Sequence, residues 1–309
     1  MGIVGLSNCI MRKIIILIVV VCSLIQSYAQ TIPYGILSAR AQGNGFQTET
    51  NTYLAAETTA GKTYTSQQQL DIDTVFRDLK GLTNPRYTTY NVLSKLTIIY
   101  PFFSGVSASD KVNMVNPGTY NYTETGSPTY STSTYSVAFN GTSQYLNTTH
   151  TPNCSGTFGG SDLTMYAYHR IDNNTDANGT IGALGCGNTY MQILNTSGVK
   201  LLVICGKTAN SSSNSQATAR LWWTSFSNSS TVNAYYNGTL MTSTGTTYDN
   251  TPTRSILIGA FNNAAVGFGG ACTVDFYCEG TGSWSDAEEA FMYNCFKQAR
   301  ADVLGITWN

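Results

Sequence analysis

The decapeptide TVNAYYNGTL, residues 231–240, indicates the fold class, because a run of β-branched and aromatic residues meets Asn237-Gly238 and a second short run follows. Asn-Gly between two such runs is typical of a β-hairpin with a two-residue turn. The same pattern recurs along the chain. Further runs of this kind are Tyr135–Phe139, Leu163–His169, Tyr190–Leu194, Lys200–Cys205, Ala219–Phe226, Ser255–Ala260 and Thr273–Glu279. Many short strands separated by turn residues predict a mainly β protein with one antiparallel jelly-roll β-sandwich.

The composition agrees with a β fold and excludes some classes of function. The chain has 309 residues, of which 42% are hydrophobic and 11% are charged, with a formal net charge of −1. This apolar content supports a folded core. A nucleic-acid-binding protein would need a clustered basic surface, which a near-neutral chain with so few charges does not predict.

The N-terminus has the pattern of an export signal. Met11-Arg12-Lys13 precedes the apolar run Ile14–Ile25, and Ser27-Tyr28-Ala29 follows it. A basic segment, a short apolar segment and a small-x-small cleavage site define a secretory signal peptide. We therefore expect residues 1–30 to be a signal peptide cleaved after Ala29, and a secreted or cell-surface protein with no membrane span after cleavage. An uncleaved anchor is the alternative, and translation could begin at Met1 or Met11.

Three regions are expected after the signal. Residues 31–65 are polar without a sustained period, which predicts an extended arm or linker, whereas residues 66–111 predict a helical hairpin and residues 112–309 the β-sandwich. The hairpin would contain Ser66–Leu79 and Thr89–Ile99, two stretches with apolar residues at helical spacing. A short helix from Ser285 to Leu304, with Glu288 at the third helical position, should close the sandwich.

Six cysteines follow the expected signal: Cys154, Cys186, Cys205, Cys272, Cys278 and Cys295. An even number in an exported chain permits three disulfides. Buried free thiols are the alternative. A structural zinc site is not expected, because no Cys-x-x-Cys pair occurs.

Several short motifs resemble concanavalin A-like lectin domains of the LamG and pentraxin type. They are VAFNGTSQYL at 137–146, AYYNGTL at 234–240, ILIG at 256–259, VDFY at 274–277 and SDAEE at 285–289. Upstream, Leu70–Leu79, LTIIYPFFSG at 96–105 and VNMVNP at 112–117 together resemble a module with a helical pair that precedes such sandwiches in bacteriophage and prophage virion proteins. The resemblance covers about residues 66–309.

The resemblance implies a non-enzymatic, lectin-like protein of a phage tail or appendage, or of a cell surface, that contacts host glycans. Its partners would be surface glycans or other virion or surface subunits, and a homotrimer is implied by the phage appendages alone. A purely structural virion or surface component without glycan binding is the alternative. The export signal conflicts with a virion location, because most virion components are assembled without export.

Enzymes also occur on this fold, with glycoside hydrolysis the third hypothesis. A retaining glycosidase needs two carboxylates about 5–5.5 Å apart. Asp275 and Glu279 are the nearest candidates, but on a regular strand their Cα atoms would lie about 13 Å apart. The chain also lacks a G-x-S-x-G nucleophile motif and a phosphate-binding GxxxxGK[ST] motif. We therefore expect no enzymatic activity.

One loop has the oxygen-rich composition of a calcium site. The candidate ligands are Asp172, Asn174, Asp176 and Asn178. Asn174, Asp176, Asn178 and Gly179 imitate the first half of an EF-hand loop, but Gly185 stands at the twelfth position, where the bidentate glutamate should be. A hairpin loop with Asx turns is the alternative.

Sugar recognition would use aromatic platforms beside amides and hydroxyls. The candidates are Trp222, Trp223, Tyr235, Tyr236 and Trp284. Core packing is the alternative for each. Adjacent residues of a strand point to opposite faces, so at least one of the two adjacent tryptophans should lie in the core.

Overall fold

The computed structural model describes the second of two compact units, Gln47–Asn309, in most of its elements, whereas Met1–Phe46 is described only at its last two residues. The described residues are 45–82, 90–151, 164–170, 179–183, 189–193, 200–204, 207–211, 220–228, 231–244, 254–262, 266–267, 271–281 and 284–308. For many strand residues between 179 and 244, only the backbone is described. The expected signal peptide, residues 1–30, lies outside them. No helix among the described residues has the length and apolar character needed to cross a membrane.

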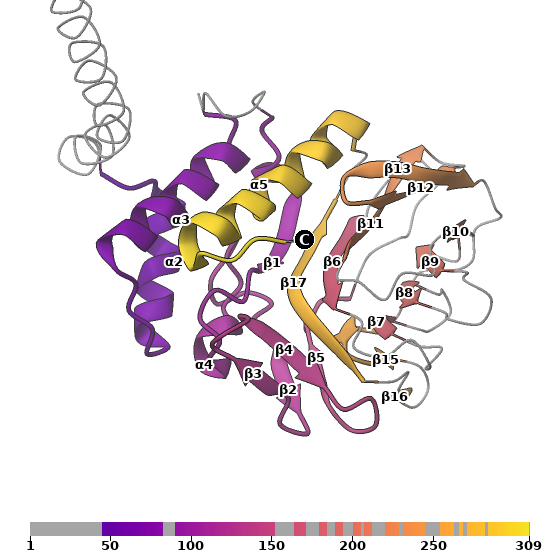
Figure 1. Ribbon diagram of the computed structural model, residues 1–309, viewed down its shortest axis with the longest axis horizontal. Coiled ribbons are helices and arrows are strands. Elements are labelled where there is room, and N and C mark those ends of the chain that lie inside the picture. Colours follow the sequence, from indigo (N-terminus) through magenta and orange to yellow (C-terminus); the bar gives the residue numbers. More distant parts are fainter. Residues whose placement is uncertain are drawn as a thin grey trace, which may run out of the picture. The chain divides into compact units, whose positions relative to one another are not determined.

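One sheet of the second unit contains eight strands in the order β13-β12-β11-β6-β17-β4-β3, with β1 also paired to β17 (Figure 1). Its strands are β1 (Leu96–Tyr100), β3 (Thr129–Ser131), β4 (Ser136–Phe139), β6 (Thr164–Arg170), β11 (Arg220–Asn228), β12 (Thr231–Tyr236), β13 (Thr239–Thr244) and β17 (Cys272–Gly280). All its pairings are antiparallel.

The other sheet contains nine strands in the order β10-β9-β8-β7-β14-β5-β2, with β15 and β16 attached. Its strands are β2 (Thr123–Thr125), β5 (Tyr145–Asn147), β7 (Gly179–Ala183), β8 (Thr189–Ile193), β9 (Lys200–Ile204), β10 (Lys207–Ser211), β14 (Leu257–Ile258), β15 (Phe261–Asn262) and β16 (Val266–Gly267). Only the pairing of β15 with β7 is parallel. The predicted antiparallel β-sandwich is therefore confirmed.

The hairpin predicted at Asn237-Gly238 forms. In it β12 and β13 pair from Val232 opposite Thr244 to Tyr236 opposite Thr239. Asn237 and Gly238 between them have φ values of 48° and 76°, the left-handed conformation at both positions that this turn requires.

The helices are α2 (Thr48–Thr59), α3 (Ser66–Leu79), the short α4 (Ser107–Asp110) and α5 (Asp286–Leu304). The first described helix, α2, begins upstream of the first helix that the sequence predicts, whereas α3 and α5 form where they are expected. α2 falls where an extended arm was expected. From Ser66 and Gln69 the sequence predicts a capping box for α3, but its partners are Thr65 and Gln68, one residue earlier. The capping box of α5 uses Ser285 and Glu288 as predicted.

The second expected helix, Thr89–Ile99, does not form in its described part. Leu93–Lys95 is a single 3₁₀ turn, and β1 follows it and pairs antiparallel with the end of β17. Ile98, Ile99 and Tyr100 are all fully buried, so both faces of this strand are covered. A strand that is apolar on both faces has no alternation, and its apolar residues also fit a helical stripe.

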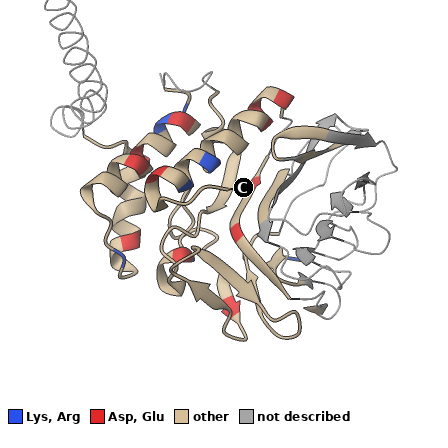
Figure 2. Ribbon diagram, in the orientation of Figure 1, with Lys and Arg blue, Asp and Glu red and all other residues tan. Residues whose placement is uncertain are grey.

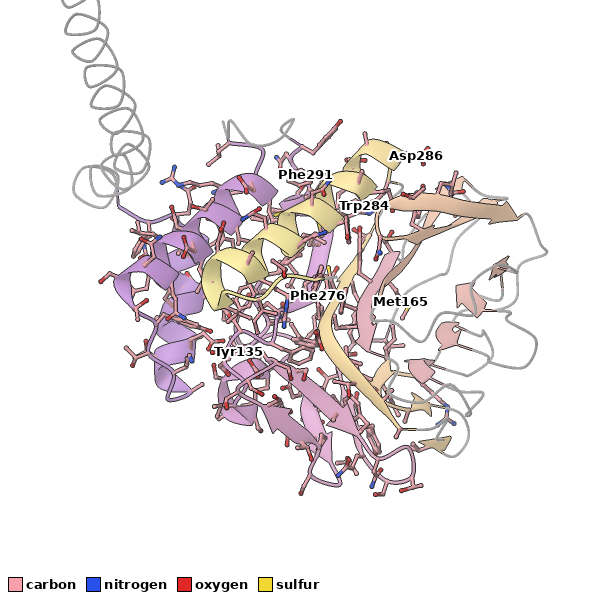
Figure 3. All side chains as sticks on the ribbon, viewed as in Figure 1. Tyr135, Met165, Phe276, Trp284, Asp286 and Phe291 are labelled. Atoms are coloured by element: carbon pink, nitrogen blue, oxygen red, sulfur yellow. The ribbon has the colours of Figure 1, made fainter. Side chains whose placement is uncertain are left out.

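Helices α3 and α5 cover one face of the eight-stranded sheet (Figure 1). Phe276 of β17 packs on Phe296 of α5 with ring centroids 4.4 Å apart, and Tyr168 of β6 stacks on Trp308 at 4.3 Å. Phe276, Trp284 and Phe291, labelled in Figure 3, belong to the same hydrophobic cluster. Helices and sheet thus share one core.

The opposite face of this sheet packs on the second sheet. Met165 and Ala167 alternate along β6 with the helix-facing Tyr166 and Tyr168, so they face the other way. A Cβ on Gly259, which follows β14, would lie 2.4 Å from the Phe139 ring of β4, so the two sheets are in direct contact there.

The described cysteines are buried. Cys278 and Cys295 are free thiols inside the helix–sheet core, and Cys272 is also buried. This agrees with the free-thiol alternative for Cys278 and Cys295. Cys154, Cys186 and Cys205 lie outside the residues whose side chains are described.

Candidate functional site

A buried carboxylate meets a histidine between the two sheets. Glu279 lies near the end of β17 with its side chain fully buried, and its Oε2 contacts Nδ1 of His150. His150 follows β5 in the other sheet and retains 15% of its side-chain exposure. Its main chain continues the pairing of that sheet, because His150 O accepts from Ile256 N at 3.0 Å. The ion pair therefore joins the two sheets.

Three tyrosines complete this cluster. The Tyr277 hydroxyl donates to Oε1 of Glu279 at 2.7 Å, and the Tyr100 ring lies parallel to the Tyr277 ring with centroids 6.0 Å apart. The Tyr100 hydroxyl in turn donates to the main-chain oxygen of Tyr120. The half-buried Tyr120 ring makes a T-shaped contact with the His150 imidazole, with centroids 4.7 Å apart. We call these five residues the His150 cluster.

The charge of Glu279 sets the protonation of His150. Burial alone would lower the pKa of His150, but attraction to Glu279 and the hydrogen bond to it outweigh burial and raise that pKa above 6.5. Burial and the same carboxylate raise the pKa of Tyr100 and Tyr277 well above 10. Both tyrosines are therefore neutral hydroxyl donors at physiological pH.

The backbone is unusual on both sides of the exposed edge of this cluster. Tyr120 has φ 55° and Thr149 has φ 59°, values that are uncommon for residues other than glycine and most unusual for a β-branched one. Local bonds hold the second strained residue, because Thr149 N donates to Asn147 Oδ1 at 2.9 Å. Strained residues fixed by their surroundings are concentrated at functional sites.

Within the cluster, only one of the two imidazole nitrogens has a described partner. Glu279 holds Nδ1 of His150, and Nε2 makes no hydrogen bond to the described residues. Among the described residues, no group of three or more His, Cys, Asp or Glu side chains is placed to hold a metal ion. What the arrangement offers is an oriented imidazole beside a half-exposed aromatic ring.

The two carboxylates considered for glycoside hydrolysis have different partners. A bulge between Val274 and Phe276 interrupts the pairing of β17 with β6, so the alternation of side chains changes at Asp275. The Asp275 carboxylate lies 3.8 Å from the Arg300 guanidinium of α5, whereas Glu279 contacts His150 in the second sheet. Both are fully buried, so neither faces a substrate.

The structure places two of the five predicted aromatic ligands in the core. Trp284 is 3% exposed and makes a T-shaped contact with Tyr166, and Tyr235 is fully buried with its hydroxyl donating to Asp286 Oδ1 at 2.6 Å. This placement agrees with the core-packing alternative. A short aromatic-rich strand does not reveal from sequence which face a helix will cover.

The other predicted ligands are described by their backbone or not at all. Trp222 pairs with Ala167 and Tyr236, and Trp223 pairs with Tyr166 and Tyr235. The side chains of Trp222, Trp223 and Tyr236 lie outside the described part of the chain. The same holds for the expected calcium ligands Asp172, Asn174, Asp176 and Asn178.

Sequence reasoning did not connect His150 to Glu279, because 129 residues separate them. The only signal was compositional. The chain has just two histidines, and Glu279 is one of two acidic residues in a mostly apolar strand.

Comparison with known proteins supports the fold. No protein-family model matches the sequence, and no curated protein matches it. A solved structure of botulinum neurotoxin type C, described as dependent on interaction with two ganglioside molecules for cell entry, matches with a TM-score of 0.50 and 11% identity over 67% of this chain and 52% of that chain. This likeness shows a shared β-sandwich fold.

Two further structures match with lower scores. The ligand-binding domain of botulinum neurotoxin serotype D, in complex with N-acetylneuraminic acid, has a TM-score of 0.48 and 10% identity over 65% of this chain and 51% of that chain. Domain 4 of an extracellular arabinanase from Geobacillus stearothermophilus, in complex with arabinotriose, has a TM-score of 0.46 and 14% identity over 63% of this chain and 97% of that chain. This chain thus spans about half of the neurotoxin structures that it matches.

Proposed function

We propose that this chain is a non-enzymatic, lectin-like protein whose β-sandwich binds carbohydrate. The observation that carries the proposal is the two-sheet sandwich, which is similar to a neurotoxin structure described as interacting with gangliosides. Since one fold hosts many functions, the proposal also needs support from the residues of this chain.

The distribution of charge fits an uncharged, hydroxyl-rich ligand. Among the described residues, the basic side chains lie mostly on and beside the helices, and the sandwich strands carry few charges of either sign (Figure 2). Threonine, serine, asparagine and tyrosine are the most frequent polar residues of this region. Such side chains hydrogen-bond to sugar hydroxyls and stack on sugar rings without the cost of burying a charge.

The buried carboxylates support a binding role over glycoside hydrolysis. Hydrolysis needs two carboxyl groups on either side of one sugar bond. Asp275 is held by Arg300 and Glu279 by His150 and Tyr277, and both are buried. Moving either toward a sugar would leave a buried partner uncompensated.

We further propose that the protein is exported and acts at a cell surface or, as the alternative, in a phage particle. The support is the signal pattern in residues 1–30 and the resemblance of residues 66–309 to phage-type lectin modules. Other surface or virion subunits, including copies of this chain in a trimer, would be its protein partners. N-terminal mass spectrometry of the protein isolated from its host tests export, because cleavage after Ala29 predicts Gln30 as the first residue.

A glycan-array screen of the intact chain tests carbohydrate binding. We expect saturable binding to a defined group of glycans, and heat-denatured protein should give none. Repeating the screen with added calcium and with a chelator tests the loop Asp172–Gly179, whose involvement predicts loss of binding under the chelator. A blank array from folded protein would contradict the proposal and favour the purely structural alternative, in which the chain is found in particles or surface layers without glycan affinity.

A further inference from the structure

The exposed edge of the His150 cluster combines an aromatic ring with polar groups from one neighbouring segment. Tyr120 and His150 make a T-shaped ring contact, and both residues keep part of their surface exposed. Asn147 is half-buried and Thr149 is exposed, and both lie beside His150 in the chain. Such a surface offers stacking and hydrogen bonding together.

The polar groups at this edge have unused hydrogen-bonding capacity. Glu279 occupies only Nδ1 of His150, and Asn147 uses its Oδ1 to accept from Thr149 N. Among the described residues, the imidazole Nε2 and the amide Nδ2 make no further hydrogen bond. Of the charged side chains among the described residues, only the buried Glu279 contacts these groups. The site therefore suits a ligand rich in hydroxyls and without charge.

The site is also held in place before any ligand binds. The Tyr100 hydroxyl fixes the main chain at Tyr120, and the Tyr277 hydroxyl fixes Glu279, which in turn orients His150. Groups that are already oriented lose little conformational entropy on binding.

We propose that Tyr120, Asn147 and His150 form a binding site for an uncharged sugar ring, which stacks on Tyr120 and hydrogen-bonds to His150 Nε2 and Asn147 Nδ2. This inference rests on the proposed carbohydrate-binding function and assigns it to particular residues. It places the site away from Trp222, Trp223 and the calcium-like loop.

The test is an NMR titration of the intact chain with the methyl glycosides of glucose, galactose, mannose, N-acetylglucosamine and N-acetylgalactosamine, with sialic acid as the charged comparison. The chain has two histidines, so a His150→Gln variant assigns the imidazole signals of His150. We expect at least one uncharged glycoside to shift those signals saturably. Tyr120→Ala should weaken that binding at least about tenfold, as loss of a central aromatic contact does, while Tyr120→Phe retains it.

Tyr293→Ala, which removes a half-buried tyrosine from α5, is the matched control and should bind as the unsubstituted chain does. Circular dichroism of each variant separates loss of the site from loss of the fold, and Asn147→Ala provides a second variant if Tyr120→Ala unfolds. His150 signals that stay fixed while the array is positive would overturn this site and leave the proposed function standing. A response to sialic acid alone would also overturn it, and a blank array with fixed signals would overturn both proposals.

Discussion

Arg300 is fully buried, and its hydrogen bonds explain how the fold tolerates its charge. Its guanidinium donates to the main-chain oxygens of Pro101, Asp275, Thr134 and Tyr135 at 2.8–3.2 Å. These carbonyls come from separate segments. One side chain of α5 therefore fixes the strand β17 to the residue that follows β1 and to the turn between β3 and β4.

Replacing the Arg300 side chain should therefore destabilise the fold strongly. We expect Arg300→Met to lower the free energy of unfolding by about 3–5 kcal/mol, because it leaves buried carbonyls and Asp275 uncompensated. Lys297→Met on the same helix, where the lysine is only half-buried, should cost less than about 1 kcal/mol. Urea denaturation of both variants measures the difference, and equal costs would contradict the role given to Arg300.

The pair of His150 and Glu279 should make stability depend on pH. The pKa of His150 is raised in the folded state, so the pair stabilises the fold fully below the unfolded pKa of about 6.5 and loses this effect as the pH rises through the folded pKa. We expect the unfolding free energy of the unsubstituted chain to exceed that of His150→Gln by about 1.5–3 kcal/mol at pH 5.5, and by less at pH 8.5. Glu279→Gln should flatten this dependence, and a difference independent of pH would refute the ion pair.

At the scale of elements, a buried acid of helix α2, Glu57, joins this helix to Tyr64 in the following loop and to Ser109 of α4. Glu57 Oε2 accepts from the hydroxyls of Tyr64 and Ser109, with Tyr53 beside it. Burial raises the pKa of Glu57 to about 7. Burial also raises the pKa of Asp110 to about 6, although hydrogen bonds from Ser104 and the charge of Lys62 lower it. Raised carboxylate pKa values mean that docking of α2 is stabilised at low pH and weakens as the pH rises through 6–7.

Protection of α2 against limited proteolysis should consequently be greater at pH 5.5 than at pH 8. Glu57→Gln should remove most of this difference and stabilise the chain at pH 8 by roughly 1–3 kcal/mol, because the neutral amide avoids burying a charge. Glu49→Gln is the control on the same helix. Glu49 pairs with Lys80 and its pKa is lowered, so this variant should leave the proteolysis difference in place.

The contact between the two sheets depends on a missing side chain at Gly259. This glycine has φ +87°, and a Cβ there would meet the Phe139 ring at 2.4 Å. We expect Gly259→Ala to lower the free energy of unfolding by more than about 2 kcal/mol, from backbone strain and overpacking together. Gly61 has a similar φ of +91° and open space around it, so Gly61→Ala measures the cost of backbone strain without overpacking. A cost for Gly259→Ala no larger than for Gly61→Ala would show that the contact is unimportant.

The elements that the sequence predicted correctly are those whose pattern is local. The hairpin at Asn237-Gly238 and the capped helix α5 each carry their signal within a few residues. α2 escaped prediction because it buries Thr50, Tyr53 and Glu57, a stripe with one aromatic residue and two polar ones. Burial of polar groups depends on partners elsewhere in the chain, which periodicity does not contain.

The candidate site was less accessible to sequence reasoning than the fold. A strand buried on both faces resembles a helix in its pattern, which explains the error at β1. The bulge at Asp275 changes which face each later residue of β17 occupies, and no turn residue announces it. The contact of His150 with Glu279 exists only once the two sheets are packed together.

At the scale of the whole second unit, the eight-stranded sheet has helices on one face and the other sheet on its opposite face. Its polar connections, Arg300 on the helix side and Glu279 on the inner side, hold one strand, β17, from both directions. We therefore interpret β17 as the element that fixes both cores, and the His150 cluster as the place where the inner core reaches the surface.

Isothermal titration calorimetry of the intact chain with the glycan that it binds best on the array is the direct test of carbohydrate binding by the sandwich. We expect a saturable isotherm for one site per sandwich, weakened at least about tenfold in Tyr120→Ala and unchanged in Tyr293→Ala. Heats indistinguishable from dilution for every glycan tested, with the protein folded, would contradict carbohydrate binding by this sandwich.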